Sequence, residues 1–115
     1  MGMISPARPP EPLLRKDLQM TVYVVALLNI SDRQEYERYA AGFMDIFGRY
    51  EGRMLAVEES PTVVEGDWPH TRTVLASFPS AEAFERWYRS DEYQAIAQHR
   101  FAGATARIVV LRGLG

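Results

Sequence analysis

The sequence predicts an α+β domain in which an antiparallel sheet of four strands carries helices on one face. Three observations support this prediction. Apolar, β-branched segments and segments of helical periodicity follow one another in the order β-α-β-β-α-β. Each crossover that contains a helix is about twenty residues long, as this motif requires. The chain of 115 residues has the length of one ordinary domain.

The first strand is expected over residues 21–30, a nearly continuous apolar segment. Because side chains alternate between the two faces of a strand, this segment has two different rows. One row is purely aliphatic and is predicted to meet the helices: Val22, Val24, Ala26, Leu28 and Ile30. The other row carries a polar group at each end: Tyr23, Val25, Leu27 and Asn29.

The first helix is predicted to begin at Ser31 or Asp32, since both fit the spacing of a capping box. Its apolar face recurs at steps of three and four residues and comprises Tyr36, Tyr39, Ala40, Phe43, Phe47 and Tyr50. Gly52 follows the last of these positions, where a left-handed glycine would end the helix.

The remaining elements follow from the same signals. Strand is expected over residues 53–57 and again over 62–65, interrupted around Pro61, with a turn at 66–69 and a third strand over 71–78. Ser80 is the expected cap of a second helical region that breaks or restarts at Ser90 and ends at Gly103. A short fourth strand is expected over 108–111.

This order is the split βαβ, or ferredoxin-like, arrangement. Right-handed crossovers place both helical regions on one face of the sheet, so the other face is left uncovered. Tyr23, Val25, Leu27 and Leu75 would form a large apolar patch there, which monomeric proteins seldom expose. A homodimer with two sheets packed against each other is the predicted solution.

Composition excludes several classes of protein. The net charge of -2 lacks the basic excess that a nucleic-acid partner requires, and the longest apolar run is far below the roughly 20 residues of a membrane span. We therefore expect no nucleic-acid and no membrane partner, and a cytoplasmic protein by default. Residues 1–20 hold four of the seven prolines and are predicted to be a flexible tail before the single domain at 21–115.

The sequence also predicts no metal site and no cofactor. It has no cysteine and two histidines, too few ligands for a dedicated zinc site, although a single axial histidine for haem stays open as an alternative. His70 is expected to be exposed at a strand start. His99 lies at the edge of its helix face and is a minor candidate for acid–base chemistry.

Arg72 is the most informative candidate for a binding residue. Strand alternation turns it toward the helices, where a guanidinium needs an acidic partner. Glu65 or Asp67 could be that partner, or the carboxylate or enolate of a ligand could take its place. Aromatic residues complete the predicted ligand-binding cleft: Tyr36, Tyr39 and Trp68 beside Arg72, with Trp87 or Tyr93 as a further wall. Ordinary core packing is the alternative for the tyrosines.

Several segments resemble the family called domain of unknown function 1330, within the dimeric α+β barrel superfamily. The matching residues are Tyr36 and Tyr39, Gly52-Arg53, Glu65-Gly66-Asp67-Trp68 with Arg72, Phe78-Pro79-Ser80, and Trp87-Tyr88 with Ser90, Glu92 and Tyr93. Glu51 and Asp91 depart from the family pattern, which often has glycine and proline there. The resemblance implies a dimer formed by two sheets meeting face to face.

The resemblance implies little chemistry, because the superfamily includes cofactor-free monooxygenases, lactone isomerases, haem enzymes and ligand-sensing domains. We expect a protein that binds a small enolisable or anionic compound. A cofactor-free oxygenase or isomerase is one form of this expectation. A non-catalytic binding or sensing module is the alternative, and the sequence does not decide between them.

Overall fold

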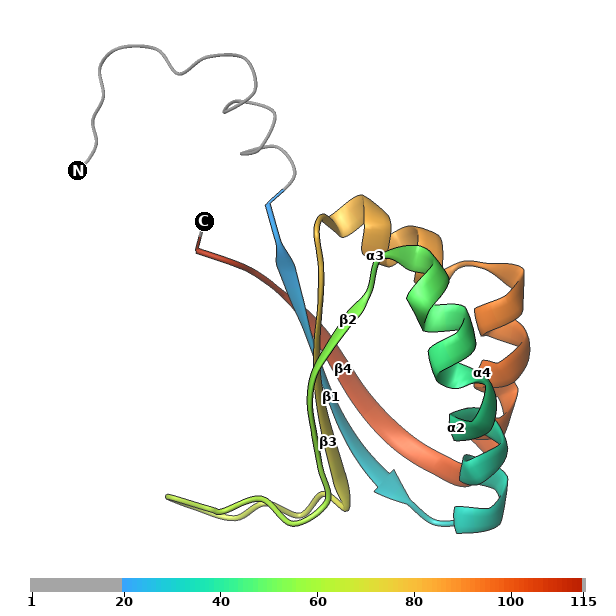
Figure 1. The fold of residues 1–115 in the computed structure, drawn as a ribbon. Helices are drawn as coiled ribbons and strands as arrows, with labels where there is room; N and C mark the ends of the chain where they lie inside the picture. Colours follow the sequence, from blue (N-terminus) through green and yellow to red (C-terminus); the bar gives the residue numbers. More distant parts are fainter. Residues whose placement is uncertain (1–19, 115) are drawn as a thin grey trace, which may run out of the picture.

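The computed structural model describes residues 20–114 and contains one antiparallel sheet with the strand order β2-β3-β1-β4 (Figure 1). The strands are β1 (Val22–Ile30), β2 (Arg53–Glu58), β3 (Arg72–Phe78) and β4 (Ala104–Arg112). The helices are α2 (Arg33–Phe47), the 3-10 turn η1 (Gly48–Tyr50), α3 (Ala81–Tyr88) and α4 (Asp91–Gly103). This is the predicted ferredoxin-like fold. The predicted tail lies, except for Met20, outside the described residues.

All the helices lie on one face of the sheet, as predicted (Figure 1). In β1 the row toward the helices is buried at Val22, Val24 and Leu28, whereas Tyr23 on the other row is 36% exposed. None of the helices in the described part of the chain is long and apolar enough to cross a membrane.

Two strand predictions are wrong. Residues 62–65 form no strand, because β2 ends at Glu58 and the chain to Thr71 runs as an extended segment that projects past the uncovered face (Figure 1). Val64 is 87% exposed in this segment, so its β-branched residues have no sheet to join. The fourth strand, β4, begins at Ala104 instead of residue 108. It is longer than predicted because it pairs with the whole length of β1, from Ala104 opposite Ile30 to Arg112 opposite Val22.

The predicted helix boundaries hold at the N-terminal ends. Asp32 is the cap of α2 and accepts a hydrogen bond from the backbone N–H of Glu35. Ser80 and Ser90 cap α3 and α4 in the same way, so the predicted break at Ser90 is a true boundary between two helices.

The end of the first helical segment differs from the prediction. Glu51, not Gly52, adopts the left-handed conformation, with a φ of 68°. Gly52 is instead needed for space, because a Cβ at that position would overlap the Phe47 ring. The glycine thus lets the chain turn closely over a buried aromatic side chain.

A cluster of aromatic side chains joins the helices to the sheet. Phe47 of α2 is 1% exposed, and its ring centroid lies 5.3 Å from that of Phe78 on β3 and 5.4 Å from that of Trp87 on α3. Edge-to-face packing at these distances is favourable beyond the area that it buries. Phe47 therefore connects α2, α3 and the sheet at one point.

A second close contact joins the start of α2 to the end of α4. The Gly103 carbonyl accepts hydrogen bonds from the backbone N–H groups of Ser31 and Asp32 at 2.9 and 3.0 Å. A Cβ at Gly103 would lie 2.9 Å from both the Asp32 carbonyl oxygen and the Tyr36 nitrogen. The two chain segments can approach this closely only because position 103 has no side chain.

We expect Gly103→Ala to lower the free energy of unfolding by about 1–3 kcal/mol, since rigid backbone atoms must move to admit the methyl group. A thermal melt should show a fall of about 5 °C or more. Gly42→Ala is the matched control, because its added Cβ would make only an ordinary contact at 3.5 Å with Ile96 and alanine favours a helix interior. Equal melting temperatures for the two variants would contradict this account.

Candidate functional site

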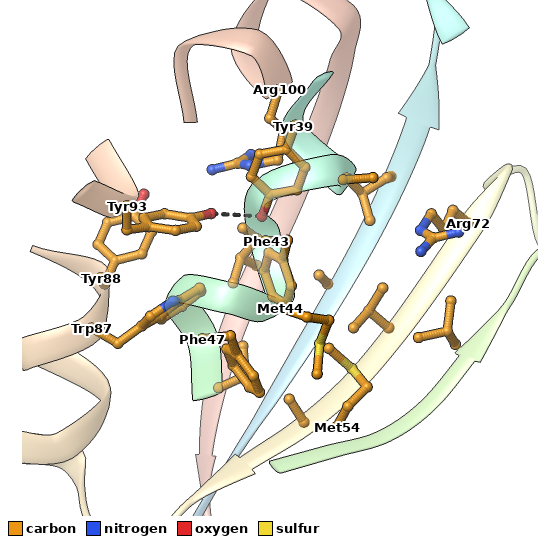
Figure 2. Close-up of a pocket in the computed structure, with 18 of the residues that line it drawn as sticks. Tyr39, Phe43, Met44, Phe47, Met54, Arg72, Trp87, Tyr88, Tyr93 and Arg100 are labelled. Atoms are coloured by element: carbon orange, nitrogen blue, oxygen red, sulfur yellow. Dashed lines mark hydrogen bonds between the residues drawn. The ribbon is translucent and has the colours of Figure 1, made fainter. Parts of the chain in front are cut away.

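A largely apolar cavity of about 330 Å³ lies between α2 and the sheet, roofed by α3 and α4 (Figure 2). Its floor is formed by Val24, Ala26 and Leu28 of β1 together with inward-facing side chains of the other strands. The polar and aromatic side chains of its lining include Tyr36, Tyr39, Arg72, Trp87, Tyr93 and Arg100. A cavity of this size and composition is typical of a site for a small organic molecule.

The structure brings five of the predicted ligand-binding residues together around this cavity. Tyr36, Tyr39, Arg72, Trp87 and Tyr93 all line it. Their placement follows from the predicted periodicities, because α2 turns its tyrosines toward the sheet and β3 turns Arg72 toward the helices.

Tyr39 and Tyr93 form a buried pair of hydroxyl groups that lie 2.8 Å apart (Figure 2). Burial raises the pKa of Tyr39 far above its ordinary value, and the neighbouring Tyr93 raises it further. Tyr39 is therefore a neutral phenol at physiological pH and acts as a hydrogen-bond donor or acceptor, not as a base.

Tyr36 lies against Arg72. The Arg72 Cζ atom is 5.6 Å from the centre of the Tyr36 ring, within the range of a cation–π contact. Burial raises the pKa of Tyr36, and the charge of Arg72 opposes that rise. The Nε atom of Arg72 is buried and has no hydrogen-bond partner among the described residues.

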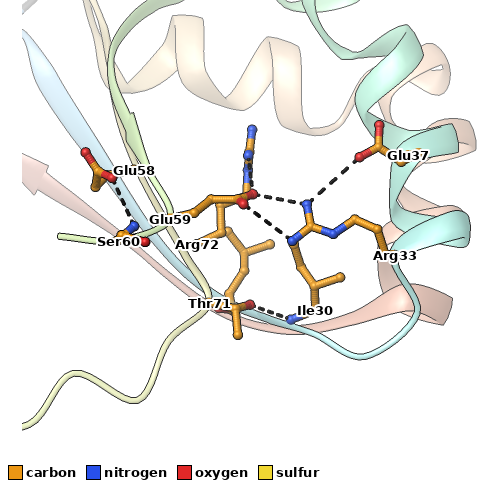
Figure 3. Close-up of polar contacts among 9 residues, drawn as sticks. Ile30, Arg33, Glu37, Glu58, Glu59, Ser60, Thr71 and Arg72 are labelled. Atoms are coloured by element: carbon orange, nitrogen blue, oxygen red, sulfur yellow. Dashed lines mark hydrogen bonds and ion pairs between the residues drawn. The ribbon is translucent and has the colours of Figure 1, made fainter.

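Glu59 is the acidic partner of Arg72, so the predicted pairing with Glu65 or Asp67 is wrong (Figure 3). The Arg72 Nη1 atom donates to Glu59 Oε2 at 2.9 Å, and Arg33 Nη1 donates to the same oxygen at 3.1 Å. Hydrogen bonds from Arg33 and then Arg72 lower the pKa of the Glu59 carboxyl. Glu59 follows directly after β2, whereas Glu65 and Asp67 lie in the projecting segment, which leads away from the helices.

Trp68 does not converge with the tyrosines. Its indole Nε1–H donates to Thr73 Oγ1 at 2.9 Å, and Thr73 points to the face opposite that of its neighbour Arg72. Trp68 thus lies on the uncovered face of the sheet, beside His70, whose ring centroid is 5.3 Å away. The prediction that Trp68 forms a wall of the cleft is corrected accordingly.

The two histidines lie outside the cavity. His99 Nδ1 is 2.7 Å from Glu35 Oε2, in a contact between α4 and α2, and His70 Nδ1 is 3.4 Å from the Asn29 amide nitrogen. His70 was expected to be exposed and is half-buried. In residues 20–114 no group of three or more histidine, aspartate or glutamate side chains could hold a metal ion.

Arg100 is a lining residue that sequence reasoning missed. It is only 5% exposed, and its Cζ atom lies 5.8 Å from the centre of the Tyr39 ring. The signal was present, because Arg100 follows Tyr93, Ile96 and Ala97 at helical spacing and so shares their buried face.

The polar groups of the cavity are mainly donors. The lining residues include two guanidinium groups, an indole and phenols, but no carboxylate or imidazole of the described residues. Three of the buried nitrogens have no partner in residues 20–114: the Nε atoms of Arg72 and Arg100, and Trp87 Nε1. The site is therefore suited to a molecule that brings hydrogen-bond acceptors and negative charge.

Tyr39→Phe tests the hydroxyl pair. The substitution leaves the Tyr93 hydroxyl without its partner, so we expect the free energy of unfolding to fall by about 1–3 kcal/mol near neutral pH. Because the pKa of Tyr39 is higher in the folded protein than its ordinary value of 10.0, its contribution is present below pH 10 and is lost as the pH rises further. Between pH 10 and higher pH, the free energy of unfolding measured with denaturant should therefore fall less for Tyr39→Phe than for the wild type.

Tyr50→Phe is the control for this experiment, since its hydroxyl meets Glu92 at the surface and its loss should change stability by less than about 1 kcal/mol. Parallel pH profiles for the wild type and Tyr39→Phe would contradict the assignment of the buried pair.

Comparison with solved structures shows the same fold in proteins of low sequence identity. RPA0582 from Rhodopseudomonas palustris, a protein of unknown function, is 18% identical, with a TM-score of 0.73 and coverage of 100% of this chain and 99% of that one. SnoaB from Streptomyces nogalater, described as a cofactor-independent oxygenase, is 15% identical, with a TM-score of 0.63 and coverage of 84% and 95%. A protein of unknown function from Bacteroides fragilis, described as dimeric and ferredoxin-like, is 10% identical, with a TM-score of 0.60 and coverage of 81% and 96%.

Among curated proteins, no sequence matches the chain. The family described as domain of unknown function (DUF1330) matches residues 21–114, which is nearly all of the part that the structure describes. The resemblance noted in the sequence is thereby confirmed, and the chain belongs to the DUF1330 family.

Proposed function

We propose that this protein binds a small, flat, anionic or enolisable molecule in the cavity between α2 and the sheet. The observation that carries the proposal is Arg72, a guanidinium that faces a largely apolar cavity and keeps a buried Nε–H without a partner among residues 20–114. Glu59 accepts a hydrogen bond from Nη1 of the Arg72 guanidinium. A ligand carboxylate or oxyanion would accept from the N–H groups of Arg72 that remain free.

The walls support a flat ligand. The rings of Tyr36, Tyr39 and Phe43 follow one another along α2 with centroid separations of 5.4 and 5.5 Å, and they form one continuous aromatic surface. A planar molecule gains stacking and apolar contact there. Its acidic group would then lie at the Arg72 end, beside the Tyr36 ring.

Two functions could use such a cavity. In the first, turnover without a cofactor, the donors would stabilise an enolate of the bound molecule, as an oxyanion hole does. The fold shared with SnoaB is compatible with this reading as an analogy only. In the second, binding without turnover, the same donors would hold a carboxylate. We place binding first, because the cavity walls contain donors and no carboxylate or imidazole base from residues 20–114.

The two functions can be separated once a ligand is known. The purified protein would be analysed by native mass spectrometry for molecules retained from the cell, and the identified ligand would be incubated with it in air. Consumption of the ligand would indicate an enzyme, and stoichiometric retention would indicate a binding module.

Arg72→Lys tests the binding site with naphthoate, a flat aromatic monoanion, as the probe. We expect the dissociation constant to rise about tenfold or more, because an ammonium group cannot reproduce the fork of the guanidinium and a hydrogen bond to a charged group contributes about 1.5–3 kcal/mol. Isothermal titration calorimetry measures the change. Arg86→Lys is the matched control, since Arg86 pairs with Glu51 at the surface and lies outside the cavity.

A purely structural role for Arg72 makes the opposite forecast. Arg72→Lys would then lower the melting temperature and leave naphthoate binding unchanged, and that result would remove the proposed function.

We also propose that the protein is a homodimer formed through the uncovered face of the sheet. Several large apolar residues on this face are each more than one-third exposed: Tyr23, Leu55, Val109 and Leu111. Monomeric proteins rarely leave an apolar patch of this kind open to water. The fold is shared with a protein described as dimeric. Two copies related by a two-fold axis would cover each other's patch with the same residues.

Val25→Asp tests the homodimer. Val25 pairs with Leu75 and Val109 in the centre of the uncovered face, so a carboxylate there would be buried unpaired in both copies. We expect dissociation of the dimer, or unfolding, in light scattering. Ala95→Asp, on an exposed position of α4, is the control and should stay dimeric. A monomeric wild type would contradict the proposal.

A further inference from the structure

We infer that Arg100 forms a second anion-recognition point on the other side of the Tyr39 ring in the same cavity, so that the ligand is a flat apolar molecule with an acidic group at each end. This inference rests on the proposed function, because it assigns the ligand class of that cavity. It goes further in requiring two acidic groups instead of one.

Arg100 is a buried cation without a counter-ion. Only 5% of the residue is exposed, and it forms no ion pair with any carboxylate in the described part of the chain. Its Nε–H has no hydrogen-bond partner there either. A guanidinium stays charged at any physiological pH, so it cannot escape burial by losing its proton.

The neighbours of Arg100 compensate for its burial only in part. The rings of Phe101 and Tyr39 lie 4.9 and 5.8 Å from its Cζ atom, which permits cation–π contact. Such contacts stabilise the positive charge of the guanidinium, but they supply no hydrogen-bond acceptor for its Nε–H group. An unpaired buried charge is unfavourable unless a partner of opposite charge completes the site.

Donors outnumber acceptors at this end of the cavity. Tyr39 and Tyr93 share one hydrogen bond between their two hydroxyl groups, so one hydroxyl proton is left to donate elsewhere. Trp87 packs against Tyr93 with ring centroids 4.2 Å apart, and its buried Nε1–H also has no acceptor among residues 20–114. A carboxylate has two oxygens and about four acceptor positions, which matches this set of donors.

The guanidinium groups of Arg72 and Arg100 lie on opposite sides of the Tyr39 ring (Figure 2). Arg72 is 5.6 Å from the Tyr36 ring, the Tyr36 and Tyr39 rings are 5.4 Å apart, and Arg100 is 5.8 Å from the Tyr39 ring. A molecule that reaches both guanidinium groups would lie along these two tyrosine rings. A planar dicarboxylate with its acids at opposite ends has this form.

The experiment compares two probes that differ only in the second acid. One is naphthoate, and the other is the symmetric naphthalene dicarboxylate with carboxylates at opposite ends of the ring system. We expect the wild type to bind the dicarboxylate at least about tenfold more tightly in calorimetry, as a charge-assisted hydrogen bond predicts. Arg100→Met should reduce this ratio to nearly one while retaining naphthoate binding.

The Arg100→Met protein should fold, because replacing a buried unpaired charge by an apolar side chain of similar length is neutral or stabilising. Arg100→Lys is a second variant, which keeps the charge and should retain part of the preference for the dicarboxylate. The ratio of two affinities does not respond to a general loss of stability, so it separates recognition from a structural role.

Each outcome has one meaning. If Arg100→Met keeps the wild-type ratio, or weakens both probes equally, or if the wild type does not prefer the dicarboxylate, the second recognition point is wrong and the proposed binding cavity stands. If the wild type binds neither probe, or if Arg72→Lys leaves both affinities unchanged, the proposed function itself fails.

Discussion

The burial of Phe47 is the constraint on which the rest of the structure depends. Its ring holds the C-terminal part of α2 against Phe78 of the sheet and Trp87 of α3, and it leaves no space for a side chain at position 52. Because large rings meet edge to face at this point, the helices are held above the sheet at a fixed height. The smaller side chains of β1, such as Ala26, do not fill the space that remains along α2, and the cavity occupies it.

The single-sided helix layer gives the two faces of the sheet different tasks. Toward the helices, the apolar rows of the strands line a cavity. The polar groups of its lining include two arginines and several tyrosine hydroxyls. On the other face, the apolar row stays exposed, and the segment between β2 and β3 carries Trp68 to that same side. One alternating pattern along each strand thus separates the proposed ligand-binding face from the proposed dimer face.

Periodicity predicted the fold and the inward direction of Tyr36, Tyr39 and Arg72, because these depend only on local geometry. It did not predict Glu59 as the partner of Arg72, since that pairing depends on where β2 ends and which way the chain leaves it. Trp68 was assigned to the wrong face for the same reason: the path of residues 59–71 is not periodic. Helical spacing places Arg100 on the face of Tyr93, Ile96 and Ala97, but spacing alone does not show that this face lines a cavity.

The close contact at Gly103 makes one end of the cavity rigid and the other adaptable. Gly103 ties the first turn of α2 to the last turn of α4, which carries Arg100, so the distance between the tyrosines and this arginine cannot change without breaking backbone hydrogen bonds. At the opposite end the lining includes Met44 and Met54, whose unbranched side chains change shape at little energetic expense. Divergence in ligand size among related chains is therefore expected to arise by exchange of these methionines, while the polar end acts as a fixed anchor.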